Sequence, residues 1–331
     1  MTLRAPFRVV WDITTRCNLS CRHCYNSSGS GNSLPPSQLL TIADKLSHSG
    51  IFFITLSGGE PLMEPEIWNI LPKFKHEKKY VQLISNGTLI TERVAQKIKD
   101  AGCDSVQISI DGLEETHDYQ RQMKGCFARS VEGINNLVEK GVPVVVNTLV
   151  SQRNLSEIPH LLEKMVEWGV TQFRTSRLIL MGRGDALERE VLTPTQTKSL
   201  IEFLLEQRRM HENTLDIVPD ECMSFLGRKI EDYNLFWYGC PAGRTECGVD
   251  SAGEVYPCIF LTHDEFAMGN LLHDDFDTIW HSEPAEQFRK MERICQCEIA
   301  DFCKGGCPAA AYARYQDATR KDPYCWRNEN E

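Results

Sequence analysis

The stretch CNLSCRHCY at residues 17–25 decides how the rest of the chain is interpreted. Its three cysteines, spaced C-x3-C-x2-C, can turn their thiolates inward on one loop and bind a metal centre through three bonds. Structural zinc normally takes four protein ligands, whereas a cubane iron-sulfur cluster with three cysteines keeps one iron site for a reacting molecule. His23 could supply a fourth zinc ligand, so the spacing of these residues by itself leaves a zinc site as an alternative.

A buried strand is expected on each side of this loop along the chain. Residues 7–13 (FRVVWDI) and 51–56 (IFFITL) are apolar and rich in β-branched and aromatic side chains, and the second run leads into SGGEP at 57–61. Parallel α/β folds bind ligands at the carboxyl ends of their strands. The cysteine loop and SGGEP should therefore lie close together.

Strand-like and helix-like segments continue to alternate after this point. Further strands are expected at 80–84, 105–110, 142–150 and 171–174, and helices at 37–49, around 67–71, and at 91–101, 128–140, 158–168 and 193–211. Six successive βα units predict an α/β fold with a parallel sheet and right-handed crossovers.

Composition excludes several classes of protein. The formal net charge of the 331 residues is −10, which argues against a basic surface for nucleic acid. The chain shows neither a signal peptide nor a long apolar run, so we expect a cytoplasmic protein with no membrane contact. Fourteen cysteines in such a compartment favour metal ligation over disulfides.

The cysteine motif followed by an aromatic residue, and GGEP after the second strand, resemble the two signatures of the radical S-adenosylmethionine (SAM) superfamily. The resemblance implies a partial, TIM-like (β/α)6 barrel in which Cys17, Cys21 and Cys24 hold a 4Fe-4S cluster that binds SAM. It also implies an enzyme that cleaves SAM reductively to a 5′-deoxyadenosyl radical, which abstracts hydrogen from an unactivated carbon.

The expected SAM contacts follow successive strands of this barrel. Glycines let the backbone approach the ligand closely, Glu60 or neighbouring carbonyls can accept from the SAM ammonium group, and Arg121 can bind the carboxylate as a fork. Residues 109–121 (SIDGLEETHDYQR) resemble the segment of SPASM-type enzymes whose serine meets the ribose and whose arginine meets the carboxylate. The candidate contacts are Tyr25, Gly58, Gly59, Glu60, Asn86, Ser109 and Arg121.

The cysteine-rich C-terminal region resembles the SPASM domain, which implies two auxiliary 4Fe-4S clusters and three clusters in all. We expect the barrel at 1–215, a linker at 216–235 and the SPASM domain at 236–331. Cys295-x-Cys297 is one residue shorter than the C-x2-C of the family, and two structural zinc ions are the alternative by ligand type. The family's interleaving assigns Cys240, Cys247, Cys258 and Cys307 to one cluster, and Cys295, Cys297, Cys303 and Cys325 to the other.

Three cysteines remain outside these sets. Cys103 and Cys126 are interpreted as small apolar core residues. Cys222 precedes the second cysteine-rich region, and if its segment lines the cleft, its thiol could donate a hydrogen atom to a substrate radical, as an epimerase requires.

The resemblance narrows the substrate only in part. VVWDITTRCNLSCRHC at 9–24 is most similar to the pyrroloquinoline quinone and mycofactocin peptide maturases, which implies oxidation, cross-linking or epimerisation of a ribosomally made peptide. A haem-pathway enzyme acting on a small molecule is an alternative, as is a sulfatase formylglycine maturase, although Ile259 replaces the aspartate expected there. A third alternative is an iron-sulfur or zinc protein that is not an enzyme and serves in electron transfer or as a scaffold. Expected partners are the peptide, a separate leader-binding protein because the barrel begins near residue 7, and flavodoxin or ferredoxin as electron donor.

Overall fold

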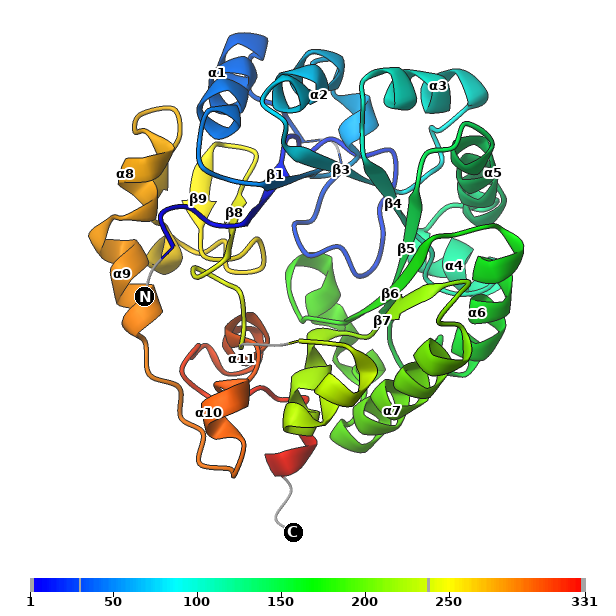
Figure 1. Cartoon of the computed structure of the whole chain (residues 1–331), viewed down its shortest axis with the longest axis vertical. Helices are drawn as coiled ribbons and strands as arrows, with labels where there is room; N and C mark the ends of the chain where they lie inside the picture. The colour runs from blue at the N-terminus through cyan, green and yellow to red at the C-terminus, as the bar shows by residue number, and fades with distance from the viewer. Residues whose placement is uncertain (1–2, 30, 237–238, 329–331) are drawn as a thin grey trace.

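The computed structural model describes residues 3–29, 31–236 and 239–328. In this part of the chain, ten strands form one sheet in the order β10-β9-β8-β1-β2-β3-β4-β5-β6-β7. Strands β1 to β7 are parallel to one another and curve around a central space (Figure 1). The strands are β1 (Arg8–Asp12), β2 (Phe53–Ser57), β3 (Tyr80–Ser85), β4 (Ser105–Ser109), β5 (Val144–Val150), β6 (Gln172–Arg177), β7 (Asp216–Val218), β8 (Glu246–Val249), β9 (Glu254–Tyr256) and β10 (Gly269–Asn270).

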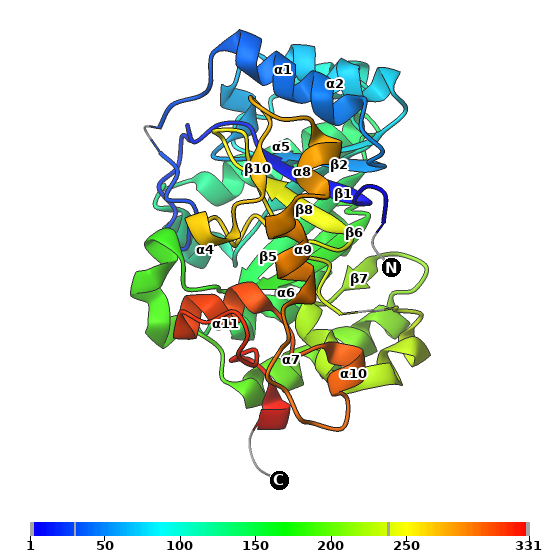
Figure 2. The same cartoon turned by 90° about the vertical axis from the view of Figure 1, so that its left-hand side faces the viewer.

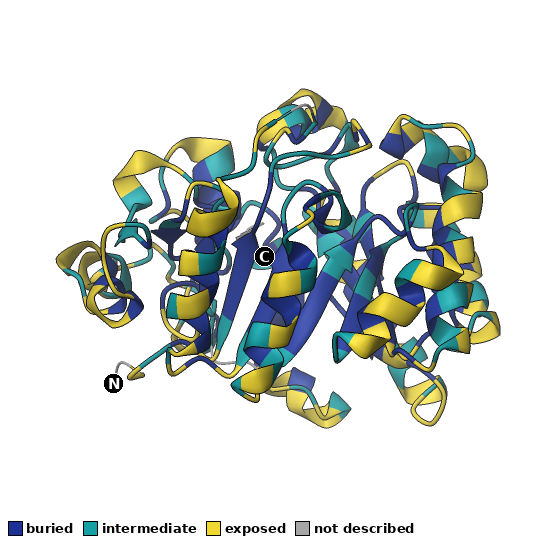
Figure 3. Ribbon diagram, turned by 90° about the horizontal axis from the view of Figure 1, so that it is seen from above, coloured by how far each residue is buried: buried dark blue, intermediate teal, exposed yellow. Residues whose placement is uncertain are grey.

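Helices cover the outside of this curved sheet and leave their outer faces to solvent, whereas the strands are buried (Figure 3). The helices are α1 (Pro36–Ser47), α2 (Ile67–His76), α3 (Glu92–Asp100), α4 (Glu114–Arg121), α5 (Cys126–Glu139), α6 (Ile158–Glu167), α7 (Pro194–Met210), α8 (Phe276–Trp280), α9 (Glu283–Lys290), α10 (Ala300–Cys303) and α11 (Pro308–Tyr315). Short 3₁₀ helices join them at η1 (Pro61–Met63), η2 (Leu155–Glu157), η3 (Gly182–Glu190), η4 (Glu221–Tyr233), η5 (Asp264–Phe266) and η6 (Trp326–Asn328).

The first strand shows how the sequence produces an inner and an outer face. Side chains alternate between the two faces of a strand. Val9 and Trp11 are fully buried in the core beneath the helices, whereas Arg8 and Val10 line the space inside the barrel. The inner face can therefore carry polar groups, while the outer face supplies the apolar contact that holds the helices.

The C-terminal region continues the same sheet. Strand β8 pairs in parallel with β1, and β9 and β10 follow it antiparallel. Helices α8 and α9 pack beside this extension (Figure 2). Residues 216–235, which we expected to link the two parts, contain β7, hydrogen-bonded to β6, and the 3₁₀ helix η4. The cysteine-rich region is thus joined to the barrel by backbone hydrogen bonds at β1.

The α/β partial barrel with six βα units agrees with the sequence-based prediction, and the bounds of the six expected strands lie within three residues of the observed ones. Helix α4 was not predicted, because its sequence EETHDYQR is almost entirely polar. In the described ranges, none of the helices combines the length and apolarity needed to cross a membrane.

Candidate active site

A cavity of about 460 Å³ opens at the carboxyl ends of the barrel strands. Residues from the N-terminal cysteine loop form one part of its wall and residues of the C-terminal region form another. The wall includes Cys17, Cys21, Cys24, Tyr25, Gly58, Gly59, Asn86, Ser109, Arg121, Arg177, Arg183, Glu246, Cys240, Cys258 and Cys307. The three cysteines of the N-terminal loop and three of the C-terminal cysteines therefore face one space.

The cysteine loop is held by contacts from two directions. The Cys17 N–H donates to the Gly29 carbonyl at 2.9 Å, which closes the loop on itself. Arg183, on η3 after β6, donates Nε–H to the Cys21 carbonyl and Nη1–H to the Ser28 carbonyl, both at 2.7 Å. The Arg183 N–H also donates to the Cys24 carbonyl at 3.0 Å. The loop is therefore fixed before any group binds to its thiols.

The chemistry of these thiols suits a bound cation. Burial, with smaller contributions from Glu60 and the thiols of Cys21 and Cys24, raises the pKa of Cys17 to about 11. Burial also raises the pKa of Cys21, although Arg121 opposes that effect. Only thiolate is a metal ligand, so a metal that binds these cysteines displaces the protons of Cys17 and Cys21. The donor set and its placement fit a cluster bound through three cysteines.

Two glycines bring the end of β2 against the base of this loop. Gly58 has φ +136°, and a Cβ there would lie 2.4 Å from the Thr14 carbonyl oxygen. A Cβ on Gly59 would lie 2.1 Å from the Arg16 carbonyl oxygen. Any side chain would push the two segments apart, so both glycines are required for the contact between β2 and the cysteine loop.

Glu60 has a different position from the one that its predicted role requires. Its side chain is fully buried and accepts hydrogen bonds from the Ser85 hydroxyl at 2.9 Å and the Asn86 N–H at 2.8 Å. The carboxylate does not contribute to the cavity wall formed by the described residues. Burial raises its pKa to about 7. Glu60 therefore joins the ends of β2 and β3.

The other predicted SAM contacts lie in the cavity wall. Asn86 donates to the Asn18 side chain at 2.8 Å, and Ser109 ends β4. The Tyr25 hydroxyl donates to Asp12 Oδ2 at 2.7 Å, which turns the ring edge against Phe260. The structure therefore brings residues from four strand ends to one space.

Arg121 is held next to the cysteine loop by a buried ion pair. Its Nη2 lies 2.6 Å from Asp111 Oδ2, and its Nη1 lies 3.7 Å from Cys21 Sγ. His23 Nε2 lies 3.3 Å from the same Asp111 oxygen. Burial lowers the pKa of His23 to about 4, so the imidazole is neutral at pH 7. His23 is directed at Asp111, an arrangement that does not suit the fourth zinc ligand considered above.

The C-terminal cysteines fall into two groups in space. Cys240, Cys258 and Cys307 line the cavity, and burial, Glu246 and then the thiols of Cys240 and Cys307 raise the pKa of Cys258. Cys247, predicted as their partner, is fully buried and lies on the face of β8 opposite to that of Glu246, which lines the cavity. Within the described ranges, no three His, Cys, Asp or Glu side chains are close enough to hold a single metal ion.

The second group lies away from the cavity. Cys295 Sγ and Cys297 Sγ are 3.7 Å apart. Burial raises the pKa of Cys325 to about 12, and the thiols of Cys303 and Cys297 contribute in the same direction. The shortened Cys295-x-Cys297 spacing therefore still brings Cys295 beside the other members of its expected set.

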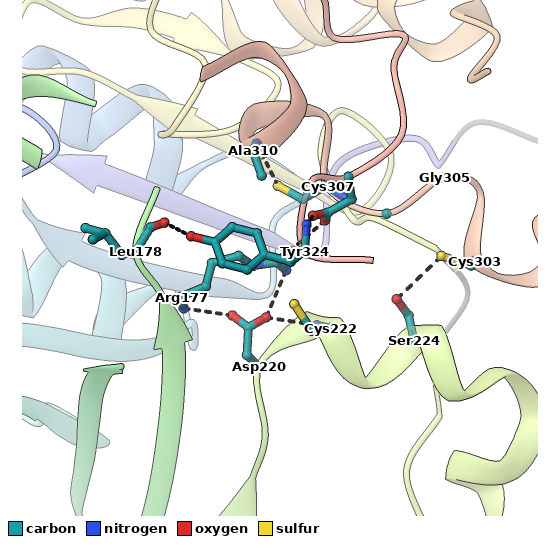
Figure 4. A network of polar contacts seen from close by, with 12 residues as sticks. Arg177, Leu178, Asp220, Cys222, Ser224, Cys303, Gly305, Cys307, Ala310 and Tyr324 are labelled. Carbon is teal, nitrogen blue, oxygen red and sulfur yellow. Dashed lines mark hydrogen bonds and ion pairs between the residues drawn. The ribbon is translucent and has the colours of Figure 1, made fainter. Parts of the chain in front are cut away.

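Cys222 lies close to residues that line the cavity but is not one of them. Its side chain is fully buried, and its N–H donates to Asp220 Oδ1 at 2.8 Å. Figure 4 shows the surrounding network, in which Arg177 binds Asp220 at 2.9 Å. Arg177 also binds Asp322 at 2.6 Å, and Asp322 accepts from the Cys307 N–H. The network joins the end of β6 to the cysteine-rich region. Cys103 is buried in the main core, whereas Cys126 is buried in a small cluster with Leu19 and Cys21 of the cysteine loop.

Family models match two parts of the chain. The radical SAM superfamily matches residues 11–165, and the iron-sulfur cluster-binding domain SPASM matches residues 240–308. The AdoMet-dependent heme synthase of Methanosarcina barkeri is 33% identical over 97% of this chain and 96% of its own length. The chain belongs to the radical SAM superfamily. It is a radical SAM/SPASM enzyme, and its family uses SAM and 4Fe-4S clusters.

Other relatives of this radical SAM enzyme extend over the whole chain. The mycofactocin maturase MftC of Mycolicibacterium smegmatis is 31% identical over 98% of this chain and 83% of that protein. Among solved structures, Streptococcus suis SuiB bound to S-adenosylmethionine has a TM-score of 0.81 and 18% identity, covering 98% of this chain and 78% of SuiB. The enzyme anSMEcpe with bound AdoMet has a TM-score of 0.75, 18% identity, and coverage of 97% and 94%. The similarity to SuiB and to anSMEcpe shows the fold that this chain shares with them.

Some residues of this radical SAM site were not predicted. Asp12 was recognisable in principle, because it is the only carboxylate in the apolar run FRVVWDI. Arg183 follows the Met-Gly-Arg-Gly break, where Gly182 lies so close to the cysteine loop that a Cβ would meet the Tyr25 carbonyl at 2.4 Å. Asp111 directly follows the expected strand at 105–110 and could have been found there, whereas Arg177 carries no local signal, since its role depends on which segments meet.

Proposed function

We propose that this radical SAM enzyme oxidises a peptide held in the 460 Å³ cavity, by a reaction that begins with removal of a hydrogen atom. The observation that carries the proposal is the shared cavity wall, in which Cys17, Cys21 and Cys24 face the same space as Cys240, Cys258 and Cys307. A substrate in this cavity would lie between the two cysteine groups. The oxidative outcome is favoured over epimerisation because Cys222 is not part of the wall formed by the described residues.

The residues that would hold the cofactors are those of the cysteine loop and the strand ends. When bound at Cys17, Cys21 and Cys24, a reduced 4Fe-4S cluster with SAM supplies the 5′-deoxyadenosyl radical. Arg121 lies where its guanidinium can bind the SAM carboxylate, with Asp111 fixing its orientation. Three clusters in the chain, one at this loop and two in the C-terminal region, form part of the proposal.

The protein's own contribution is to orient the substrate and to exclude water. The cavity wall carries five arginines against three acidic residues, which favours a substrate with a carboxylate group. Four of these arginines already contact carboxylates or carbonyls of the protein, so the preference rests on the net positive charge of the wall. The wall residues concerned are Arg8, Arg121, Arg174, Arg177 and Arg183, with Asp111, Asp220 and Glu246.

Two relatives support a peptide as the substrate. The mycofactocin maturase MftC of Mycolicibacterium smegmatis aligns with nearly the whole chain, and SuiB has been solved bound to its precursor peptide SuiA. In this proposal a leader-binding protein delivers the peptide, and flavodoxin or ferredoxin supplies the electron that starts the reaction. These partners follow from the peptide substrate and from the need for a reductant.

A porphyrin is the second candidate substrate. The observation that favours it is the 33% identity to a heme synthase over 96% of that protein's length. A porphyrin with carboxylate side chains would meet the same arginines. The two substrates differ in shape, since a peptide enters as an extended chain and a porphyrin as a flat disc.

One experiment separates the two. The anaerobically reconstituted enzyme is given SAM and a reductant, with either the short peptide encoded beside its gene or a porphyrin, and each product is analysed by mass spectrometry. A peptide that loses hydrogen supports the main proposal. A changed porphyrin absorbance together with an unchanged peptide would replace it. Formation of 5′-deoxyadenosine in each reaction confirms that the enzyme is active.

A further inference from the structure

Strand β8 presents adjacent residues to opposite sides of the sheet. Its register on β1 pairs Glu246 with Arg8 and Cys247 with Val9. Arg8 and Glu246 line the cavity, whereas Val9 and Cys247 belong to the buried core beneath the helices. Because side chains alternate along a strand, Cys247 and the cavity lie on different faces of β8.

The surroundings of Cys247 are those of a core residue. The side chain is 0% exposed. Its thiol lies on the same side of the sheet as α9, whose Arg289 stacks over the Trp280 ring at 4.2 Å and donates to the Gly243 carbonyl. Rotation about one Cα–Cβ bond cannot carry a thiol through a hydrogen-bonded sheet. The set Cys240, Cys247, Cys258 and Cys307 therefore does not fit one cluster.

Glu246, and not Cys247, is the residue of β8 that faces the cavity. The Gly243 N–H donates to both the Glu246 carbonyl at 2.8 Å and the Pro257 carbonyl at 2.9 Å, so these two backbone segments are adjacent. A Cβ on Gly248 would lie 3.0 Å from the Cys258 carbonyl carbon, which places Cys258 directly against β8. Glu246 thus lies next to a cavity-lining cysteine.

We propose that the auxiliary cluster beside the cavity is bound by Cys240, Cys258 and Cys307, with the Glu246 carboxylate as its fourth ligand, and that Cys247 is a core residue. Arg8 orients this carboxylate, because its Nη1 lies 3.4 Å from Glu246 Oε2 and its Nε donates to the Thr55 hydroxyl at 3.1 Å.

A carboxylate ligand changes what this cluster can do. Oxygen ligands are harder than thiolates and bind a soft iron-sulfur site less firmly, so another oxygen or nitrogen donor can replace them. The exchangeable iron would face the cavity, where a carboxylate of the substrate could bind to it. The assignment of the four ligands depends on the family match and on the orientation of β8. Only the binding of a substrate carboxylate to the iron rests on the proposed function.

The test measures iron, acid-labile sulfide and the electron paramagnetic resonance spectrum of the reduced full-length enzyme. Cys247→Ala and Cys247→Ser are compared with Cys258→Ala and with the core-cysteine control Cys103→Ala. Both Cys247 variants and the control should keep the iron content and the spectrum of the wild type, while Cys258→Ala should lose the iron of about one cluster in three. A Cys247→Ser spectrum with a shifted auxiliary signal, or iron loss equal to that of Cys258→Ala, would overturn the assignment.

The Glu246 ligand is tested by a second pair of variants. Glu246→Gln should shift the auxiliary signal, because a neutral amide is a weaker ligand than a carboxylate. Glu283→Gln, the same substitution at an exposed position of α9, is the control and should leave the iron content and the spectrum of the wild type unchanged. A Glu246→Gln spectrum that superimposes on that of the wild type would exclude Glu246 as a ligand. None of these readouts depends on the substrate, so failure of the peptide proposal would leave them unaffected.

Discussion

Arg183 donates its Nε–H to the carbonyl oxygen of Cys21 at 2.7 Å, across the mouth of the barrel. Its Nη1–H reaches the Ser28 carbonyl, so one guanidinium holds both sides of the cysteine loop. Hydrogen bonds from charged donors contribute about 1.5–3 kcal/mol each. The stability of the bound cluster should therefore depend on a residue that does not contact its metal.

The first prediction follows from this contact. Arg183→Lys replaces the fork by a single ammonium group, which cannot reach both carbonyls. We expect a chelator to remove iron from the cysteine-loop cluster roughly tenfold faster or more, as the loss of a single charged hydrogen bond implies. Loss of iron is followed by absorbance under anaerobic conditions. The control is Arg189→Ala, on the same 3₁₀ helix and exposed. Equal rates for both variants would contradict the prediction.

The buried charge network around Arg177 leads to a second prediction. Arg177→Met leaves the carboxylates of Asp220 and Asp322 buried without their cation. Removal of one partner from a buried ion pair costs roughly 3–5 kcal/mol. The apparent unfolding temperature of the holoenzyme, measured by scanning calorimetry, should fall clearly. Arg228→Met removes an exposed pair with Glu231, and its unfolding temperature should stay near that of the wild type.

Asp12 predicts a dependence of stability on pH. Burial raises the pKa of Asp12 from 3.8 to about 6, although Tyr25 and Asn26 donate to the carboxylate. The folded state therefore holds the proton more tightly than the unfolded state, and this stabilisation is present at low pH and lost as the pH rises through about 6. Between pH 5 and 7 the loss from this group is about 1 kcal/mol.

Asp12→Asn should remove that part of the pH dependence. The apparent unfolding temperature of the wild type should fall between pH 5 and 7 more steeply than that of the variant. Burial raises the pKa of Glu60 as well, so a smaller slope should persist in Asp12→Asn. Glu212→Gln, at an exposed position, provides the control and should retain the wild-type slope. Parallel curves for wild type and Asp12→Asn would refute the role of Asp12.

Cys222 gives a prediction about the reaction itself. Its thiol is fully buried, and burial raises its pKa well above the usual range. Because it does not face the cavity, Cys222→Ala should form as much modified product per 5′-deoxyadenosine as the wild type. Mass spectrometry in deuterated water provides the measurement, with Cys103→Ala as the control. Continued SAM cleavage with loss of product in Cys222→Ala alone would restore the hydrogen-donor role.

The sequence was sufficient for the parts of the site that depend on local patterns. Cys17, Cys21 and Cys24 follow an apolar strand, and Gly58 and Gly59 follow the next, so the meeting of these segments follows from the rules of parallel sheets. The face of Cys247 could not be predicted, because β8 has only four residues and its orientation depends on its register with β1. A strand of four residues is too short for its sequence pattern to show which of two adjacent residues faces the cavity. Either residue is then an equally plausible cluster ligand.

Glu60 and α4 illustrate two other limits. The sequence places Glu60 at a strand end, but it does not show whether the side chain points into the cavity or into the protein interior. The direction depends on Ser85 and Asn86 at the end of β3, which donate hydrogen bonds to the carboxylate. Helix α4 ends at Gln122 in the left-handed conformation, where a glycine would have marked the end more clearly. Its buried residues His117, Gln120 and Arg121 are all polar, and Arg121 lines the cavity.

The pairing of β8 with β1 also affects how the chain acquires its structure. Strand β1 is synthesised first, yet its second neighbour in the sheet is made only after the entire barrel. Until then, one edge of β1 and the cysteine loop that follows it lack their C-terminal neighbours. Contacts between such distant segments slow folding, and an unpaired strand edge invites association with other chains. The barrel and the cysteine-rich region should therefore form a single cooperative unit, and a barrel expressed without the C-terminal strands should aggregate.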